Sequence, residues 1–418
     1  MRQVPINSQF TFIFPFFLII IIDVMSTSIT SPVFAYAVQH PELHILGLYT
    51  NAHQRHILFG WLKSIVPLCN TLGTLILGYY SDYVGRRKIL IVCVIGTLLG
   101  LLGYIVSFTL ASFKVLFISS MLTGFTAGSA AVAQAAMADI STPAEKAKNI
   151  SMIALALTLG FVLSSALGGV LADNTLVAWF DKKTPLYFSA ILSFISLLVA
   201  LLFLKETCQV NKRLSDDFFK RSVSLLKTFY QILFKKNIFF ILLVFLFFEL
   251  GWGIYFNSIS LTLVQSFAST QRLAGLFPSY VGIVMSLGLF YGIRFLTQHF
   301  SLTALSAPSL LIGAIVMVIG FFIRTMWVQW LIALPIALIV AFTYSSLIAM
   351  ASNKINEEHQ GVLMSITDAL LALAFMIDGF LIGIVTTHDA LWPQMIGAIF
   401  LFFAFLVYPL AKHQYQRS

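Results

Sequence analysis

The sequence has few charged residues. Asp, Glu, Lys and Arg make up 10% of the 418 residues, whereas hydrophobic residues make up 59%. A soluble globular domain carries roughly 25% charged residues, so the composition excludes a soluble protein and makes lipid the solvent for most of the chain. The three cysteines (Cys69, Cys93 and Cys208) show no CxxC spacing, and we predict neither a disulfide framework nor a metal site from them.

The chain also lacks the short motifs of common enzyme and pump classes. No GxxxxGK[ST], HExxH or GxSxG pattern occurs in it. We therefore predict no enzyme, no ATP hydrolysis and no cofactor. The net charge of +9 comes from short loops between apolar runs, so it reports membrane topology and gives no reason to expect a nucleic-acid partner.

Long apolar runs are what the sequence does contain. Each crossing of about 30 Å of hydrocarbon needs about 20 apolar residues. Runs of that length are expected at 9–37, 56–80, 88–109, 113–138, 146–172, 183–204, 237–265, 274–298, 303–323, 327–351, 359–386 and 392–411. The first run carries Asp23 and has a weak basic head, which favours a retained span over a cleaved signal peptide.

The loop charges predict the orientation and the domain organisation. Lys and Arg are more numerous in the loops that lie on the same side of the membrane as both termini. Both termini are therefore expected in the cytoplasm. The expected location of the protein is the inner membrane of a bacterial cell. Segment 205–236 mixes charges with apolar residues at helical spacing and is expected to be a basic amphipathic linker on the membrane surface. It divides a six-span bundle at 1–204 from another at 237–418; a partner-docking role for the linker is the alternative.

A glycine-containing basic motif stands between the second and third predicted spans. It reads Gly78-Tyr-Tyr-Ser-Asp82-Tyr-Val-Gly85-Arg86-Arg87-Lys88. Gly78 and Gly85 permit close helix approach and a sharp turn. Asp82 can cap a helix or pair with a basic residue, and Arg86 can contact a carboxylate with two nitrogens. We predict a tight cytoplasmic hinge at this position.

This motif resembles the signature of the major facilitator superfamily, and the resemblance is closest to its twelve-span drug:proton antiporters, including the tetracycline efflux proteins. Ala136-Met-Ala-Asp139 resembles the end of that group's fourth span, which implies that Asp139 pairs with Arg86 at a cytoplasmic gate. Asp23 and Pro32 are similar to the acidic first span of the tetracycline exporters, and Glu206 lies in a stretch like the usual close of a sixth span. The implied fold is all-α: twelve transmembrane helices in two pseudo-symmetric six-helix bundles, usually as a monomer.

Two stretches depart from the antiporter pattern. The motif of the fifth span keeps glycines at Gly160, Gly168 and Gly169, but Ser164 and Ser165 stand where a glycine-proline pair is usual. In the fourth span Ser120 occupies the place of an arginine. Both features are associated with proton-driven export, so the resemblance implies the family more firmly than the direction of transport.

Ionisable residues inside the predicted spans are candidate functional groups. A charge in hydrocarbon is costly, so such residues usually face a wet cavity and serve function. Those considered are Asp23, Glu249, Asp368, Asp378 and Lys63. For proton coupling we rank Asp23 and Glu249 first and Asp368 next, because Asp378 is expected nearer the mouth of the cavity.

Several local interpretations remain open at this point. Asp23 and Lys63 are expected at nearly the same depth, where Lys63 either pairs with Asp23 or extends outward alone. Glu249 precedes Gly251-Trp-Gly253, which predicts either a locally broken helix or close glycine packing. Asp368 and Asp378 are about 80° apart around a helix and are expected to share one broad face.

Other polar and aromatic groups give weaker signals. Four histidines crowd the first outer loop, where they either bind metal, sense pH or are simply solvated: His40, His44, His53 and His56. The 40 phenylalanines either line an aromatic cavity or pack helices and face lipid.

The predicted function is secondary active transport by alternating access, with a small-molecule substrate, protons and the lipid bilayer as partners. Export of an amphipathic organic compound is favoured. Uptake of a nutrient or metal chelate is the alternative within transport, and a non-transporting receptor or a membrane enzyme is the alternative outside it.

Overall fold

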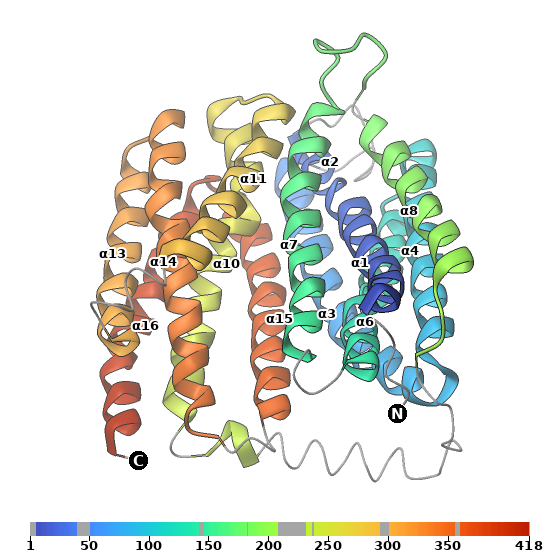
Figure 1. Cartoon of the computed structure of the whole chain (residues 1–418). Coiled ribbons are helices and arrows are strands. Elements are labelled where there is room, and N and C mark those ends of the chain that lie inside the picture. The colour runs from blue at the N-terminus through green and yellow to red at the C-terminus, as the bar shows by residue number, and fades with distance from the viewer. Residues whose placement is uncertain are drawn as a thin grey trace. The chain divides into compact units, whose positions relative to one another are not determined.

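The computed structural model describes residues 6–39, 51–141, 146–181, 183–207, 231–235, 238–292, 301–355 and 360–417. Every regular element in these ranges is a helix (Figure 1). This agrees with the all-α fold expected from the apolar runs, because a helix satisfies all backbone hydrogen bonds within one segment, as hydrocarbon demands.

The chain divides into two compact units. Unit 1 comprises Met1–Arg55, Ile65–Leu214 and Ser269–Ser279, and unit 2 comprises His56–Ser64, Ser215–Ala268 and Tyr280–Ser418. Each unit therefore takes one short piece from the opposite half of the sequence. The boundary near 214 falls inside the segment 205–236. Residues 208–230 and 236 of this segment lie outside the described residues, so its predicted amphipathic helix stays a prediction.

The N-terminal half contributes eight helices in its described part. They are α1 (Ile6–Ser28), α2 (Ser31–Gln39), α3 (Ala52–Val84), α4 (Arg86–Leu110), α5 (Phe113–Thr126), α6 (Ser129–Ile140), α7 (Lys146–Val170) and α8 (Thr184–Phe203). Two predicted spans are interrupted: α1 gives way to α2 at Ile29–Thr30, just before Pro32, and α5 gives way to α6 at Ala127–Gly128. Proline fits the first turn of a helix because it lacks an N–H.

The C-terminal half contributes the remaining described helices. They are α10 (Phe239–Phe267), α11 (Gln271–Leu287), the π-helical segment η2 (Gly288–Gly292), α13 (Leu302–Phe322), α14 (Met326–Ser352), α15 (Gln360–Val385) and α16 (Trp392–Arg417). The first residues of α11 belong to unit 1 and its later residues to unit 2.

Ten segments of the described chain are long and apolar enough to cross a membrane. α1 with α2 forms one of them, and α5 with α6 forms another. The two remaining predicted spans coincide with α7 and α11, whose described apolar parts are shorter. The helices are thus compatible with the twelve predicted spans.

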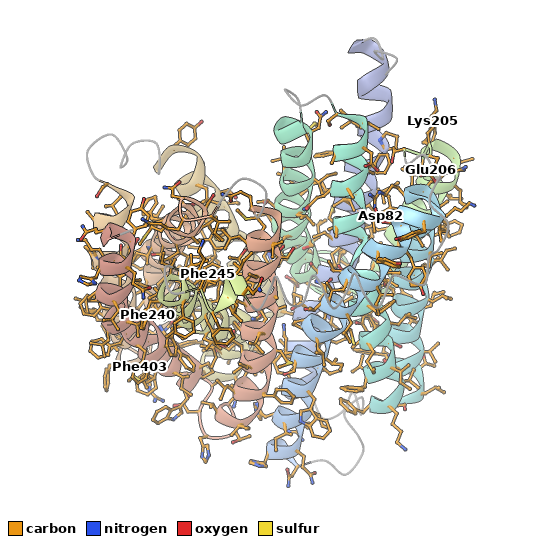
Figure 2. All side chains as sticks on the ribbon, turned by 90° about the horizontal axis from the view of Figure 1, so that it is seen from below. Asp82, Lys205, Glu206, Phe240, Phe245 and Phe403 are labelled. Carbon is orange, nitrogen blue, oxygen red and sulfur yellow. The ribbon has the colours of Figure 1, made fainter. Side chains whose placement is uncertain are left out.

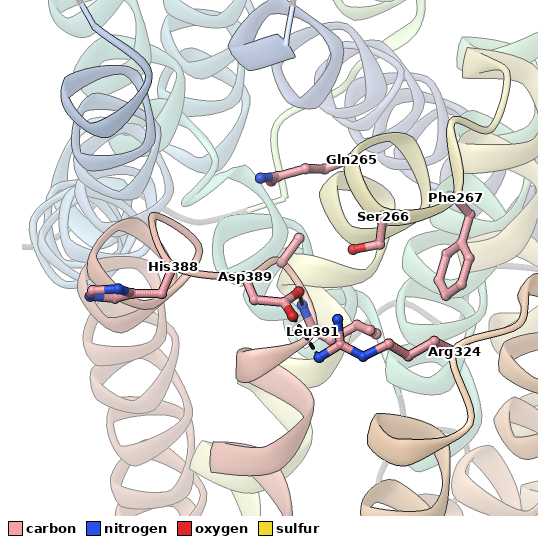
Figure 3. A pocket seen from close by; sticks show the side chains of 8 residues that line it. Gln265, Ser266, Phe267, Arg324, His388, Asp389 and Leu391 are labelled. Atoms are coloured by element: carbon pink, nitrogen blue, oxygen red, sulfur yellow. Dashed lines mark hydrogen bonds and ion pairs between the residues drawn. The ribbon is translucent and has the colours of Figure 1, made fainter.

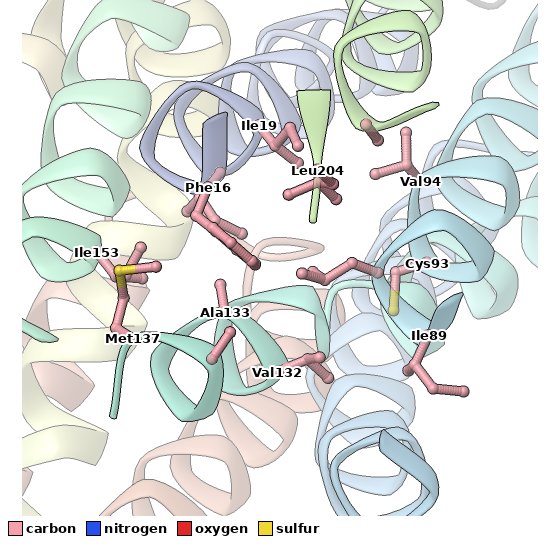
Figure 4. Close-up of a cluster of buried hydrophobic side chains, with 14 of the residues drawn as sticks. Phe16, Ile19, Ile89, Cys93, Val94, Val132, Ala133, Met137, Ile153 and Leu204 are labelled. Carbon is pink, nitrogen blue, oxygen red and sulfur yellow. The ribbon is translucent and has the colours of Figure 1, made fainter. Parts of the chain in front are cut away.

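Each unit has its own apolar core. In unit 1 the buried side chains of α1, α3, α4, α6, α7 and α8 form one cluster, with Phe16, Val94 and Ile153 among them (Figure 4). Ala133 and Ala136 keep α6 narrow there, which allows close helix approach. The core of unit 2 is richer in aromatic rings, such as Phe245 (Figure 2), so part of the phenylalanine content packs helices.

Candidate functional site

The basic motif forms a tight turn between two helices of unit 1. Gly85 has φ +109°, a value that residues with side chains rarely adopt, and it ends α3 and begins α4 at once. This confirms the predicted sharp turn. Gly78 behaves differently, because a methyl group placed on it would meet nothing within 4 Å in the described part of the chain. The close helix approach expected at Gly78 is therefore not found among these residues.

Arg86 is the centre of an ionic network at this turn. Its Nε lies 3.0 Å from Asp139 Oδ2 and its Nη2 lies 2.5 Å from Asp82 Oδ1. Its Nη1 also donates a short hydrogen bond to Ser81 Oγ. The Arg86–Asp139 pair implied by the family resemblance is therefore confirmed. Since only 9% of the Arg86 side chain is exposed, the two carboxylates neutralise a nearly buried charge.

Glu206 joins the same network from beyond the end of α8. Its Oε1 accepts a hydrogen bond from the backbone N–H of Arg86 at 2.8 Å, so it caps the first turn of α4. Figure 2 labels Glu206 near Asp82. A methyl group on Gly85 would overlap Glu206 Oε2. The resemblance placed Glu206 only at the close of the sixth span, because nothing local in the sequence pairs it with a turn 120 residues earlier.

Arg87 takes a different role from its neighbour. Its Nη2 donates a hydrogen bond to the backbone oxygen of Leu201 in α8 at 3.0 Å, at an exposed position. The two arginines of the motif thus tie α4 to three different elements: Arg86 to α3 and α6, and Arg87 to α8.

Asp23 lies buried in α1, with 4% of its surface exposed. Its Oδ2 accepts a hydrogen bond from Ser129 Oγ at 2.7 Å, and Thr97 of α4 offers a further hydroxyl contact. The break between α5 and α6 brings Ser129 to the beginning of α6. Asp23 Oδ1 is buried and has no hydrogen-bond partner within the described part of the chain.

Lys63 belongs to unit 2, whereas Asp23 belongs to unit 1. The Lys63 ammonium lies 5.6 Å from the centre of the Phe59 ring, one turn earlier in α3, which is cation–π range. Its pairing with Asp23 stays a prediction.

Glu249 sits in the middle of α10 with 2% of its surface exposed. α10 runs unbroken from Phe239 to Phe267, so the interpretation of Gly251 and Gly253 as a helix break is wrong. The glycines instead give close packing. A methyl on Gly251 would lie 2.8 Å from the backbone oxygen of Gly397 in α16, and one on Gly253 would overlap the carboxylate of Asp378 in α15.

Asp378 and Asp368 differ in burial, and their ranking for proton coupling stays a prediction. Asp378 is fully buried, and neither of its oxygens has a hydrogen-bond partner among the described groups. Asp368, expected to be the deeper of the two, is exposed. The two residues are about 80° apart around the axis of α15. Asp378 faces α10, where its carboxylate lies against Gly253, and Asp368 lies outside that contact.

Tyr344 of α14 is a neighbour of these acids that the sequence analysis missed. It interacts electrostatically with both Glu249 and Asp368, and its ring centre lies 5.8 Å from that of Phe245. The available signal was a tyrosine inside the predicted span 327–351.

The glycines of α7 serve close packing within unit 1. A methyl on Gly160 would lie 2.9 Å from the backbone oxygen of Ile21, and one on Gly168 would lie 2.5 Å from that of Ile29, so both keep α7 against α1. A methyl on Gly169 would lie 2.7 Å from the backbone oxygen of Arg272, near the beginning of α11. All three positions therefore exclude a larger side chain.

The histidines do not form a metal centre in the described part of the chain. No group of three His, Cys, Asp or Glu side chains converges there. His53 is exposed, while His56 is buried and its Nδ1 lies 2.9 Å from Thr386 Oγ1. His40 and His44 lie outside the described residues.

A cavity of about 260 Å³ opens among the ends of α10, α13, α15 and α16 in unit 2 (Figure 3). Arg324 Nη2 and Asp389 Oδ2 form an ion pair 2.7 Å long in its wall. Gln265, also in the wall, lies sixteen residues after Glu249, or about 24 Å along the helix. The cavity is therefore remote from Glu249.

Comparisons with known proteins identify the relatives of this chain. The model of the Major Facilitator Superfamily matches residues 16–378. Human major facilitator superfamily domain-containing protein 10 is 29% identical over 169 residues, or 40% of this chain and 34% of the relative. The class H tetracycline resistance protein of Pasteurella multocida is 29% identical over 149 residues, or 36% of this chain and 35% of the relative. Both alignments span about a third of the curated relative.

Solved structures show the same architecture over nearly the whole length. The crystal structure of the human organic anion transporter MFSD10 (TETRAN) superposes with a TM-score of 0.67 at 19% identity, covering 97% of this chain and 100% of that one. At this identity the likeness concerns the fold.

Proposed function

Because the chain belongs to the Major Facilitator Superfamily, a family of small-molecule transporters, we propose that it is a secondary transporter that exports a small amphipathic organic compound in exchange for protons. It is a multi-pass membrane protein. We further propose that the protein acts as a monomer in a bacterial inner membrane, with both termini in the cytoplasm. The two bundles would comprise residues 1–204 and 237–418, joined by the linker 205–236.

The observation that carries the proton coupling is the burial of carboxyl groups inside apolar helices. Asp23 and Glu249 are 4% and 2% exposed, and Asp378 is fully buried. An ionised carboxylate in such surroundings costs several kcal/mol by usual estimates. Taking up a proton removes that charge, so proton binding changes the free energy of any conformational step that moves these groups between water and protein.

The direction of transport rests on the relatives. A tetracycline resistance protein is similar to about a third of this chain, and this favours export. Ser164, Ser165 and Ser120 replace residues associated with export in the antiporters, and this favours the alternative, uptake of a nutrient or metal chelate. Family members are transporters and not enzymes, so we do not propose catalysis.

The test uses the full chain in proteoliposomes loaded with a pH-sensitive dye. Amphipathic drugs and small nutrients are added outside, one at a time. We expect one of the drugs to enter while protons leave, which is antiport. Entry of protons together with a substrate would replace export by the import alternative, and a proton gradient that drives no compound would contradict the proton coupling.

Asp23→Asn examines the role of the buried carboxyl in unit 1. The amide keeps the shape of the side chain and removes the titratable group, so we expect substrate-dependent proton movement to fall to the level of empty vesicles. Asp389→Asn is the matched control, because Asp389 lies in the loop between α15 and α16. Unchanged proton movement in Asp23→Asn would remove Asp23 from the mechanism.

A further inference from the structure

The interruption between α5 and α6 lies next to the buried carboxyl of Asp23 in unit 1. α5 ends at Thr126 and α6 begins at Ser129, and the backbone hydrogen bonds of α6 begin with Val132 N–H, which donates to Gly128 O. The first N–H groups of a helix have no partner within that helix, and together they carry a partial positive charge. A helix start therefore lies inside unit 1, and it favours an anion nearby.

Ser129 uses its hydroxyl differently from the hydroxyl residues of α5. Ser120, Thr123 and Thr126 each donate to the carbonyl oxygen four residues earlier, at 2.9 to 3.0 Å. This bond within the helix is the usual one for a buried serine or threonine. Ser129 instead donates to Asp23 Oδ2 at 2.7 Å, and both side chains are buried. The interruption thus gives Ser129 a carboxylate as its partner.

Glycines of α3 and of the interruption hold this arrangement. A methyl on Gly73 of α3 would overlap the carbonyl oxygen of Phe125, which is the oxygen four residues before Ser129. A methyl on Gly128 would lie 2.9 Å from the backbone of both Gly73 and Thr74. α3 therefore lies directly against the backbone where α5 gives way to α6, and this contact fixes Ser129 next to it.

A second hydroxyl lies at the same carboxyl. Thr97 of α4 is fully buried and contacts Asp23, and its Oγ1 lies 3.1 Å from Thr126 Oγ1. Asp23 Oδ1 is buried without a hydrogen-bond partner among the described residues. Hydrogen bonds to a charged acceptor are stronger than those to a neutral one, so these hydroxyl donors favour the ionised carboxyl over the neutral one.

The basic residues of the helices packed on α1 lie at a distance along those helices. α1 packs mainly against α4, α6, α7 and α8. At least nine residues separate the basic residues of α4 from Thr97, and at least twelve separate those of α7 from Gly160, which is level with Asp23. These separations are about 13 Å and 18 Å along a helix. Lys63, the predicted partner of Asp23, belongs to unit 2. The titratable residues of the four helices are Arg86, Arg87, Lys88, Cys93, Tyr104, Asp139, Lys146, Lys148 and Tyr187.

We propose that Ser129 is a positioning residue, which holds the ionised form of Asp23 at the start of α6 in place of a basic partner. When Asp23 releases its proton to water, the Ser129 hydroxyl donates to the resulting carboxylate, and Thr97 and the helix start add to its stabilisation. The part of Ser129 in transport rests on the proposed function, because it acts through Asp23. The hydrogen bond that stabilises the carboxylate does not depend on transport.

Infrared difference spectroscopy of the purified full chain in lipid tests this role without any substrate. The C=O band of neutral Asp23, identified by its loss in Asp23→Asn, is followed while pH is raised. Ser129→Ala removes the donor, so the band should disappear at a pH about one unit higher than in wild type. Ser129→Thr returns a hydroxyl and should restore the wild-type midpoint.

Controls separate the hydrogen bond from packing and from a lysine partner. Ser107→Ala is the matched control, because Ser107 is fully buried but donates to Tyr104 O at 2.7 Å within its own helix, and it should keep the wild-type midpoint. Lys63→Gln should change the midpoint less than Ser129→Ala does. The proposal is overturned by an unchanged midpoint in Ser129→Ala, by equal midpoints in Ser129→Thr and Ser129→Ala, or by a larger change in Lys63→Gln.

Further variants cover the case in which Ser129→Ala does not fold. Ser129→Cys keeps the volume but replaces a good donor by a weak one, so the midpoint should again move to higher pH. Gly128→Ala keeps every hydroxyl but forces a methyl against Gly73, and it should move the midpoint because the interruption cannot keep its backbone. A wild-type midpoint in both variants contradicts the proposal. So does a band of Asp23 that persists in wild type to strongly alkaline pH, because the ionised form is then not held.

Transport assays distinguish this proposal from the proposed function. In proteoliposomes the pH profile of substrate-dependent proton movement should shift upward in Ser129→Ala by the same amount as the band. If the band shifts and a proton gradient drives no compound, the proposed function fails and the positioning role stands. If a substrate moves protons with the same pH profile in Ser129→Ala and wild type, the positioning role is wrong and the proposed function stands.

Discussion

The turn between α3 and α4 gives the sharpest prediction, because two glycines of one motif have opposite surroundings. Gly85→Ala forces a methyl group onto a backbone with φ +109° and into the Glu206 carboxylate. The strained backbone costs about 1–3 kcal/mol. Losing the cap that Glu206 provides for α4 costs about 1 kcal/mol more. The expected destabilisation is thus at least about 2 kcal/mol.

Gly78→Ala is the matched control in the same motif. A methyl on Gly78 meets open space inside a helix, so the lower backbone entropy of alanine should raise stability by up to about 1 kcal/mol. The two substitutions therefore have opposite predicted signs.

Thermal unfolding in detergent measures both variants. Cys69 and Cys93 are free and buried, so a thiol-reactive dye reports their exposure as the protein unfolds. At about 2–4 °C per kcal/mol, Gly85→Ala should lower the midpoint by at least about 4 °C, while Gly78→Ala should leave it equal or higher. Equal midpoints for Gly85→Ala and wild type would refute the account of the turn.

Two further predictions concern charges in unit 1. Asp139→Asn should lower the free energy of unfolding by about 1–3 kcal/mol, and Asp82→Asn by at most about 1 kcal/mol. The reason is that Arg86 and Asp139 are more buried than Asp82. A larger effect of Asp82→Asn in the same thermal assay would contradict this reasoning. The side chain and backbone N–H of Thr175 hold the pKa of Asp173 below its usual range. Protection of the amides at 171–176 from hydrogen exchange, relative to their intrinsic rates at each pH, should therefore be full above the ordinary carboxyl pKa and fall as pH drops through the lowered one. Thr175→Ala should weaken that pH dependence.

The all-α class and the positions of the long apolar helices followed from local sequence, because apolar length decides whether a segment can lie in hydrocarbon. The interruption at Ala127–Gly128 was not predicted, since apolar composition continues across it. The turn at Gly85 and the Arg86–Asp139 pair were predictable from motif residues. The Glu206 cap was not, because its partner is 120 residues away in sequence.

The sequence by itself determined that several acids lie inside the apolar helices, but only the tertiary structure decided which of them are buried. Helical periodicity gives the angle between Asp368 and Asp378 but not the direction in which either points. That direction is set when α15 packs against α10, and Gly253 leaves the space that admits Asp378. The tertiary structure likewise decided the role of the glycines near Glu249. They let α15 and α16 approach α10 closely, and the backbone hydrogen bonds of α10 stay intact.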